Sequence, residues 1–274
     1  MELSQIFTLA AKEFRDRIRN RWVLAVALVF TVFSLVITYL GGAQQGQIGL
    51  KSIELTITSL VSLVIYLIPL IALLLGFDAI VGERERGSLD LLLALPITRM
   101  EILLGKYLGL AGALTLSTIA GFSLVAVLLY QQFSWAGLFH YLGFMLSSVL
   151  LGLAFLSLAV FMSVVARERT RASGMAIALW FFFVLVFDLL LLGALVGTSG
   201  NFGNYGSDIF AYLLLLNPAD VFRILNVFSM DDVRTLYGLA SIIPPALAQP
   251  WMMGSVMFAW IIVPLALARW RFTS

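Results

Sequence analysis

Two aspartates interrupt long apolar stretches of this chain, and they are the first candidates for chemistry. Asp78 lies near the end of LIPLIALLLGFDAIVGE, and Asp188 lies in the middle of WFFFVLVFDLLLL. A carboxylate inside a membrane span is energetically costly, so it indicates a functional role by default. By helical rise Asp188 is about 22 Å from one end of its span, whereas Asp78 is about one turn from the corresponding end. A catalytic aspartate pair needs a common depth, and the spacing therefore argues against an intramembrane protease.

Asp188 has two interpretations that the sequence leaves open. It is either a polar group in a translocation or gating region, or a structural carboxylate that is hydrogen-bonded across helices or protonated by burial. Asp78 and Asp188 are the two intramembrane polar candidates of the chain.

Other catalytic and metal-binding patterns are absent from the sequence. There is no cysteine, and the one histidine, His140, has no ligand-type neighbour and is expected in a solvent-facing loop. Gly105 and Lys106 do not complete a phosphate-binding GxxxxGK[ST] loop, because Met100 and Tyr107 replace the first glycine and the hydroxyl residue. HExxH, CxxC and GxSxG are also missing. We therefore predict no catalytic residue, no metal site and no cofactor in this chain, which is not an enzyme.

The composition defines the class of protein. Hydrophobic residues make up 61% and charged residues 12% of the 274 residues, and the mean hydropathy is +1.03. Soluble domains carry about 25% charged residues, so the chain is predicted to be an all-helical polytopic membrane protein. Residues 1–274 are expected to form a single transmembrane domain, because the spans leave no room for a second domain of ordinary size.

Six apolar stretches are long enough to cross a hydrocarbon core of about 30 Å. They cover about 22–41, 60–81, 107–130, 141–166, 173–197 and 252–268. Before them, residues 2–21 repeat apolar side chains at helical spacing, with Lys12, Asp16 and Arg19 on the opposite face. This pattern predicts an amphipathic helix at the membrane interface.

The loop of residues 82–106 is the longest charged interruption between spans, and it contains a short helix of its own. Gly87 should break the preceding helix, Ser88 can cap the next one, and Pro96 should end it after about two turns. Leu89, Leu92 and Leu93 fall on one face of that helix. This helix either docks in a groove on a soluble partner or lies on lipid headgroups.

The segment of residues 198–251 differs from the rest of the chain. Its apolar piece, residues 209–216, is too short to cross a membrane and is interpreted as re-entrant or interfacial. Asn217 at a cap and Pro218 at the first helical position predict a helix start. Three polar side chains share one face of this helix: Asp220, Arg223 and Asn226.

The basic residues orient the chain. If both termini, the loop of residues 82–106 and the link of residues 167–171 share one side, that side carries fourteen lysines and arginines and the other carries three. Because cytoplasmic loops are rich in these residues, both termini are predicted to lie in the cytoplasm of a bacterial inner membrane. Segment 198–251 then faces the periplasm.

With these residues in place, the chain resembles the ABC-2 type permeases over its whole length. The resemblance rests on the interfacial helix, the six spans and the loop GERERGSLDLLLALPITRMEILLGK, in which Ser88 stands where threonine is frequent. It implies that the short helix is a coupling helix on a separate ATPase subunit, which holds the ATP and Mg²⁺. Coupling positions carried over from the family, together with the helix face above, are Glu83, Arg84, Glu85, Arg86, Gly87, Leu89, Leu92, Leu93 and Pro96.

Within that family, WFFFVLVFDLLLL, LLLLNPADVFRILN and LIPLIALLLGFDAIVGE resemble the permease branch that serves nitrous oxide reductase maturation. This resemblance implies a homodimer with two ATPase subunits and a periplasmic partner that helps to supply copper sites. It predicts no nucleic-acid partner. The partner-facing residues would be Asn217, Pro218, Asp220, Arg223 and Asn226.

Three mechanisms stay open at this stage. The permease transmits movement to the periplasmic partner, or it transports a sulfur species or copper, or it is a lipid or polysaccharide exporter. The absence of cysteine and the single histidine argue against a copper path through this chain.

Overall fold

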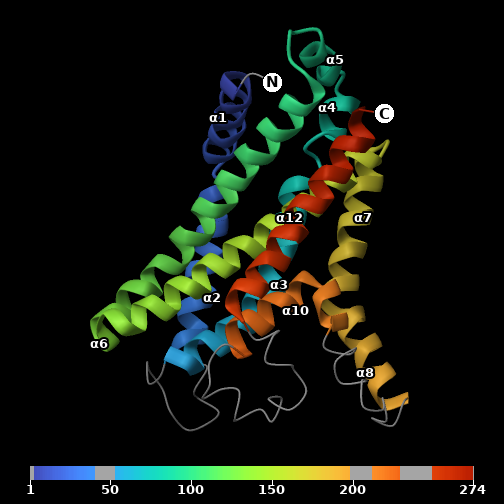
Figure 1. Ribbon diagram of the computed structural model, residues 1–274. Coiled ribbons are helices and arrows are strands. Elements are labelled where there is room, and N and C mark those ends of the chain that lie inside the picture. The colour runs from blue at the N-terminus through green and yellow to red at the C-terminus, as the bar shows by residue number, and fades with distance from the viewer. Residues whose placement is uncertain (1–2, 41–52, 198–211, 229–248, 274) are drawn as a thin grey trace.

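Six helices of the computed structural model are long and apolar enough to cross a membrane, which confirms the prediction of an all-helical polytopic membrane protein. They are Trp22–Leu40, Thr56–Glu85, Arg99–Gln132, Leu138–Val165, Arg169–Ala194 and Pro250–Phe272. The structure describes residues 3–40, 53–197, 212–228 and 249–273, and Figure 1 shows their arrangement. Much of the predicted segment 198–251, namely residues 198–211 and 229–248, and the link of residues 41–52 lie outside the described residues.

Every element assigned in those ranges is helical. In chain order the elements are α1 (Leu3–Arg19), α2 (Trp22–Leu40), α3 (Ile53–Gly76), α4 (Val81–Glu85), α5 (Ser88–Leu93), α6 (Arg99–Val165), α7 (Arg169–Phe181), the π-helical turn η2 (Phe182–Val186), α8 (Phe187–Gly197), η4 (Leu214–Leu216), α10 (Pro218–Arg223), the π-helical turn η5 (Ile224–Phe228) and α12 (Pro250–Thr273).

Helix α6 contains two spans that fold back on each other (Figure 1). The Tyr107 hydroxyl donates to the Leu153 carbonyl oxygen at 3.2 Å, and the Phe122 and Phe144 rings meet edge to face at 5.5 Å. The prediction of a loop around His140 is wrong, because His140 lies inside the helix Leu138–Val165 and the chain reverses before it.

The two arms of α6 form the centre of the molecule. Helices α1, α2, α3 and α12 each pack against α6, and one hydrophobic core draws on elements from α1 to α12. Two large aromatic side chains, Tyr141 and Phe155, are completely buried in it. Because α6 contacts both the N-terminal and the C-terminal helices, a movement of α6 would displace both.

Helix α1 packs closely along the first arm of α6 because small residues face it there. A Cβ atom added to Gly109 would lie 2.6 Å from the Ala10 carbonyl oxygen and 2.6 Å from the Glu13 Cβ. Gly105 meets Leu9 in the same way. Such small residues let helix backbones approach each other in a membrane.

Both termini, α4 and α5 lie at the same end of the molecule, at the top of Figure 1. We call this the terminal end. Helix α10 lies nearer the other end, and its start confirms the predicted signal, because the Asn217 side chain accepts a hydrogen bond from the Ala219 N–H at 3.0 Å and Pro218 follows it. Helix α10 packs among α3, α6 and α12. Non-spanning backbone at membrane depth is tolerated where other helices shield it from lipid.

Candidate functional site

The junction between α4 and α5 begins with a sharp turn at Gly87. Gly87 has a φ of 70°, a left-handed conformation that suits glycine, and it is the N-cap of α5. The prediction that Ser88 caps this helix is wrong, since Ser88 is its first helical residue. Its hydroxyl instead donates to the Glu83 carboxylate and fastens the start of α5 to α4. The helix ends at Leu93, and Pro96 follows three residues later.

The apolar face of α5 is turned toward the chain itself. Leu89 is only 6% exposed, and Leu92 and Leu93 pack half-buried against the hydrophobic core. This face is therefore largely occupied by the chain itself, and the coupling role of Leu89, Leu92 and Leu93 stays a prediction. The exposed residues are Asp90, Leu91, which is 72% exposed, and Leu95, which is 52% exposed. We call Asp90 and Leu91 of α5, together with Leu95 just after it, the outer surface of α5.

Lys106 joins three elements beneath α5. Its ammonium group lies 2.9 Å from Glu83 on α4 and 3.2 Å from Glu13 on α1, and the lysine side chain is only 4% exposed. Glu13 also pairs with Arg17 at 3.2 Å. Because buried charges require partners, these contacts hold α1, α4 and α6 in one arrangement.

A second set of contacts connects α4 to the start of α7. Asp78 pairs with Arg86 at 3.5 Å and with Arg169 at 2.9 Å. Arg84 donates to the Ala166 carbonyl oxygen at 2.7 Å, and the Glu85 carboxylate accepts the Arg169 N–H at 2.6 Å. The charged residues that resemble the coupling loop therefore contact their own chain and fix α4 to α7.

Two further contacts close the junction. The Ser163 hydroxyl accepts the Ile80 N–H at 2.9 Å and the Val81 N–H at 3.0 Å, which ties the start of α4 to the end of α6. Arg99 donates to the Phe272 carbonyl oxygen at 2.7 Å and so ties α6 to the end of α12. The loop of residues 82–106 is thus braced against α1, α6, α7 and α12.

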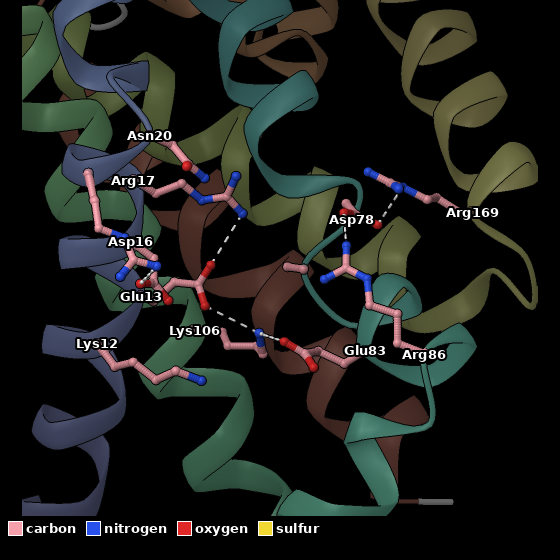
Figure 2. Close-up of a pocket in the computed structure, with 12 residues that line it drawn as sticks. Lys12, Glu13, Asp16, Arg17, Asn20, Asp78, Glu83, Arg86, Lys106 and Arg169 are labelled. Carbon is pink, nitrogen blue, oxygen red and sulfur yellow. Dashed lines mark hydrogen bonds and ion pairs between the residues drawn. The ribbon is translucent and has the colours of Figure 1, made fainter.

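A polar cavity of about 390 Å³ lies between α1, α4, α6 and α7, and Figure 2 shows its side chains. Acidic and basic groups alternate around it, and the ion pairs of Lys106 and Asp78 cross it. Its lining consists of Lys12, Glu13, Asp16, Arg17, Arg19, Asn20, Asp78, Ala79, Glu83, Arg86, Lys106 and Arg169.

Toward the opposite end, Arg223 on α10 joins two carboxylates. It lies 3.1 Å from Asp188 on α8 and 2.6 Å from Asp220 on its own helix. The Asn217 amide donates to Asp220 at 2.9 Å and to the Phe183 carbonyl oxygen at 2.8 Å. Of the two interpretations of Asp188, these contacts favour a carboxylate that is bonded across helices.

The predicted partner-facing residues do not lie on the surface. Asn217, Pro218 and Asp220 are buried in the chain, and Asn226, which is also buried, accepts a hydrogen bond from the Ser147 hydroxyl at 2.9 Å. Arg223 is the most exposed of the five, with 38% of its side chain accessible. These side chains fasten α10 between the spans, so the prediction that they face a partner is wrong for the four buried ones.

Sequence reasoning missed Lys106, Glu13 and Ser163 as members of the junction. No local pattern marks Glu13 or Ser163, since their partners are distant in the chain. The pattern around Lys106 indicates only that it completes no phosphate-binding loop. One available signal was the spacing of Gly105, Gly109 and Gly112 in GKYLGLAG, which predicts a close helix contact. Among the described residues, no group of three or more histidines or carboxylates is arranged to hold a metal ion.

Comparison with known proteins agrees with this architecture. Residues 7–274 match the family model described as ABC-2 family transporter protein. Two curated relatives are each called "Probable ABC transporter permease protein NosY", one from Stutzerimonas stutzeri and one from Pseudomonas aeruginosa. Each is 43% identical over 273 residues, which is 97% of this chain and 97% of the relative. The chain therefore belongs to the ABC-2 family of transporters, and it is a membrane-spanning permease of the NosY type.

Proposed function

We propose that this permease couples ATP hydrolysis by a separate ATPase subunit to events on the opposite side of the membrane. The observation that carries the proposal is the two-sided character of α5. One face, with Leu89, is packed into the chain, whereas Leu91 and Leu95 are exposed beside it. A short helix that is anchored on one side and apolar on the other suits docking to a protein partner.

Leu91 on α5 and Leu95, two residues after its end, are both exposed, and we infer that they contact one groove on the ATPase. The ATPase, and not this chain, would bind the ATP and Mg²⁺. The terminal end would lie in the cytoplasm, because fourteen of the seventeen basic residues were assigned to that side of the inner membrane.

Movement of α5 would reach the rest of the permease through the junction. The ion pairs of Lys106 would transmit the movement to α1 and α6. The contacts of Asp78 and Glu85 with Arg169 would transmit it to α7. From α7 the chain continues through η2 into α8, where Asp188 holds Arg223 of α10. Through these contacts a displacement at α5 would become a displacement of α10.

The names of the relatives and the resemblance of the sequence suggest the biological system. We place the permease in the copper-site maturation of nitrous oxide reductase, as a homodimer with two NosF-like ATPase subunits and a NosD-like periplasmic protein. Segment 198–251 would contact that periplasmic protein through surfaces other than the buried side chains of α10. The support is the 43% identity to NosY permeases over nearly the whole chain.

Reconstitution tests mechanotransmission against transport. The permease and its ATPase are placed in vesicles, and labelled sulfide and copper(I) are followed with and without ATP while the conformation of the periplasmic protein is recorded. We expect an ATP-dependent conformational change without flux. Flux of either solute would identify a transporter, and ATP-dependent movement of lipid would identify an exporter.

A matched pair of variants locates the coupling surface when binding of the ATPase to each variant is measured. Leu91→Ala should reduce ATPase binding, because it removes an exposed apolar contact of α5. Leu3→Ala is the control, since Leu3 is 68% exposed on α1 at the same end of the molecule. Equal binding by both variants would contradict docking through the outer surface of α5.

A further inference from the structure

The polar cavity of Figure 2 lies beside the ends of helices that belong to three candidate spans. Asn20 lies two residues before the start of α2, and Asp78 lies two residues after the end of α3. Arg169 is the first residue of α7. Side chains at the ends of spans lie at the depth of lipid headgroups. The cavity is therefore at headgroup depth, on the membrane side of α5.

The cavity has an excess of positive charge. Six lysine and arginine side chains line it against four carboxylates. All four carboxylates already have cations: Glu83 pairs with Lys106, Glu13 with Lys106 and Arg17, Asp78 with Arg86 and Arg169, and Asp16 with Arg19. The difference of two positive charges is not neutralised by groups that line the cavity.

Lys12 supplies part of this excess. Its side chain points toward the cavity from α1, and it takes part in no hydrogen bond or ion pair among the described residues (Figure 2). The same helix exposes apolar side chains, with Phe7 64% exposed and Ile18 41% exposed. A free cation on a helix that also presents apolar surface suits a ligand with an anionic head and acyl chains.

We propose that this cavity binds the phosphate group of an anionic phospholipid. The phosphate lies among Lys12, Arg17 and Arg86, and the acyl chains extend from the cavity into the surrounding bilayer. A bound headgroup bridges α1 and α4 and adds a lipid contact to the junction beneath α5. Basic cavities between membrane helices on the side rich in lysine and arginine are suited to anionic headgroups.

The test uses the full-length chain, purified in detergent and stripped of lipid. Phosphatidylglycerol, phosphatidylcholine and inorganic phosphate are each titrated, and binding is followed by native mass spectrometry and by thermal unfolding. We expect phosphatidylglycerol to bind about tenfold more tightly than phosphatidylcholine and to raise the unfolding temperature. Inorganic phosphate should neither stabilise the protein nor displace the lipid, since it lacks acyl chains.

Variants of α1 connect the binding to the cavity. Lys12→Gln should weaken phosphatidylglycerol binding about fivefold, whereas Lys12→Arg should retain it. Arg15→Gln is the control, because Arg15 lies exposed on the same helix and does not line the cavity. Equal binding of the two lipids would overturn the proposal, as would equal effects of Lys12→Gln and Arg15→Gln. Displacement of the lipid by inorganic phosphate would assign the cavity to a free anion and overturn it as well.

Discussion

Replacing Lys106 by methionine tests whether the junction beneath α5 is held by charge. Methionine fills a similar volume but leaves Glu13 and Glu83 without the shared cation, which lies 3.2 Å and 2.9 Å from them. Removing one partner of a buried ion pair destabilises a protein by about 3–5 kcal/mol, because the remaining charge stays buried. Glu13 keeps Arg17 and Glu83 keeps the Ser88 hydroxyl, so we expect a loss of about 3 kcal/mol, at the lower limit.

The assay is reversible unfolding of the purified permease in mixed micelles, followed by circular dichroism. Arg15→Met is the control, since Arg15 is an exposed residue of α1 outside the cavity. The double variant Lys106→Met with Glu83→Gln removes one of the unpaired carboxylates and should recover part of the lost stability. A loss below about 1 kcal/mol in Lys106→Met would mean that water screens the cluster, and the junction would not be held by charge.

The same variants separate stability from coupling. Lys106→Met with Glu83→Gln removes the charged contact between α4 and the first arm of α6 and leaves the hydrogen bonds of Ser163 to the start of α4 in place. ATPase activity in the reconstituted complex should then no longer depend on the periplasmic partner, although the complex still forms. Normal dependence on that partner would show that coupling takes another route.

Three further predictions concern packing, docking and the opposite end of the molecule. Gly109→Ala should displace α1 and destabilise the protein by about 1–3 kcal/mol in the same unfolding assay, because the added Cβ would lie 2.6 Å from two α1 atoms. Gly143→Ala on the same helix meets no atom within 4 Å and should be neutral or slightly stabilising. Leu91→Asp should prevent pull-down of the ATPase without changing stability, whereas Leu89→Asp should destabilise the permease, because only Leu89 is buried. Arg223→Met should lower stability by about 3 kcal/mol and loosen α10 in hydrogen exchange, because two carboxylates lose their shared cation; unchanged exchange in α10 would contradict this role.

Local signals in the sequence predicted the elements well. The uncharged runs identify six spans because a helix that crosses hydrocarbon needs about 20 apolar residues. Asn217 and Pro218 identify the start of α10 because a cap acts on the N–H groups next to it in the chain. Gly87 marks the turn before α5 for the same reason, since its conformation is set by its own backbone.

The sequence did not predict which groups meet across the fold. Asp188 and Arg223 are 35 residues apart, and Glu13 is 93 residues from Lys106, so no spacing rule connects them. The apolar pattern of α5 identified the correct face, but it did not say whether that face packs on the chain or on a partner. Because an amphipathic helix buries its apolar face wherever a core is available, the chain itself covers Leu89 and leaves Leu91 outside.

The proposed coupling depends on the arrangement of charges around α4 and α5. A six-residue helix has little rigidity of its own, and α5 alone would move without consequence. Its connection to α4 changes this, because α4 is fixed to α1 and α6 through Lys106 and to α7 through Arg169. The π-helical turn η2 lies between α7 and the Asp188 contact with α10, and such turns are points where a helix can shift. In the proposed coupling, a push on Leu91 would move a unit that is fixed at one end, and η2 would be the place where the motion changes direction before it reaches α10.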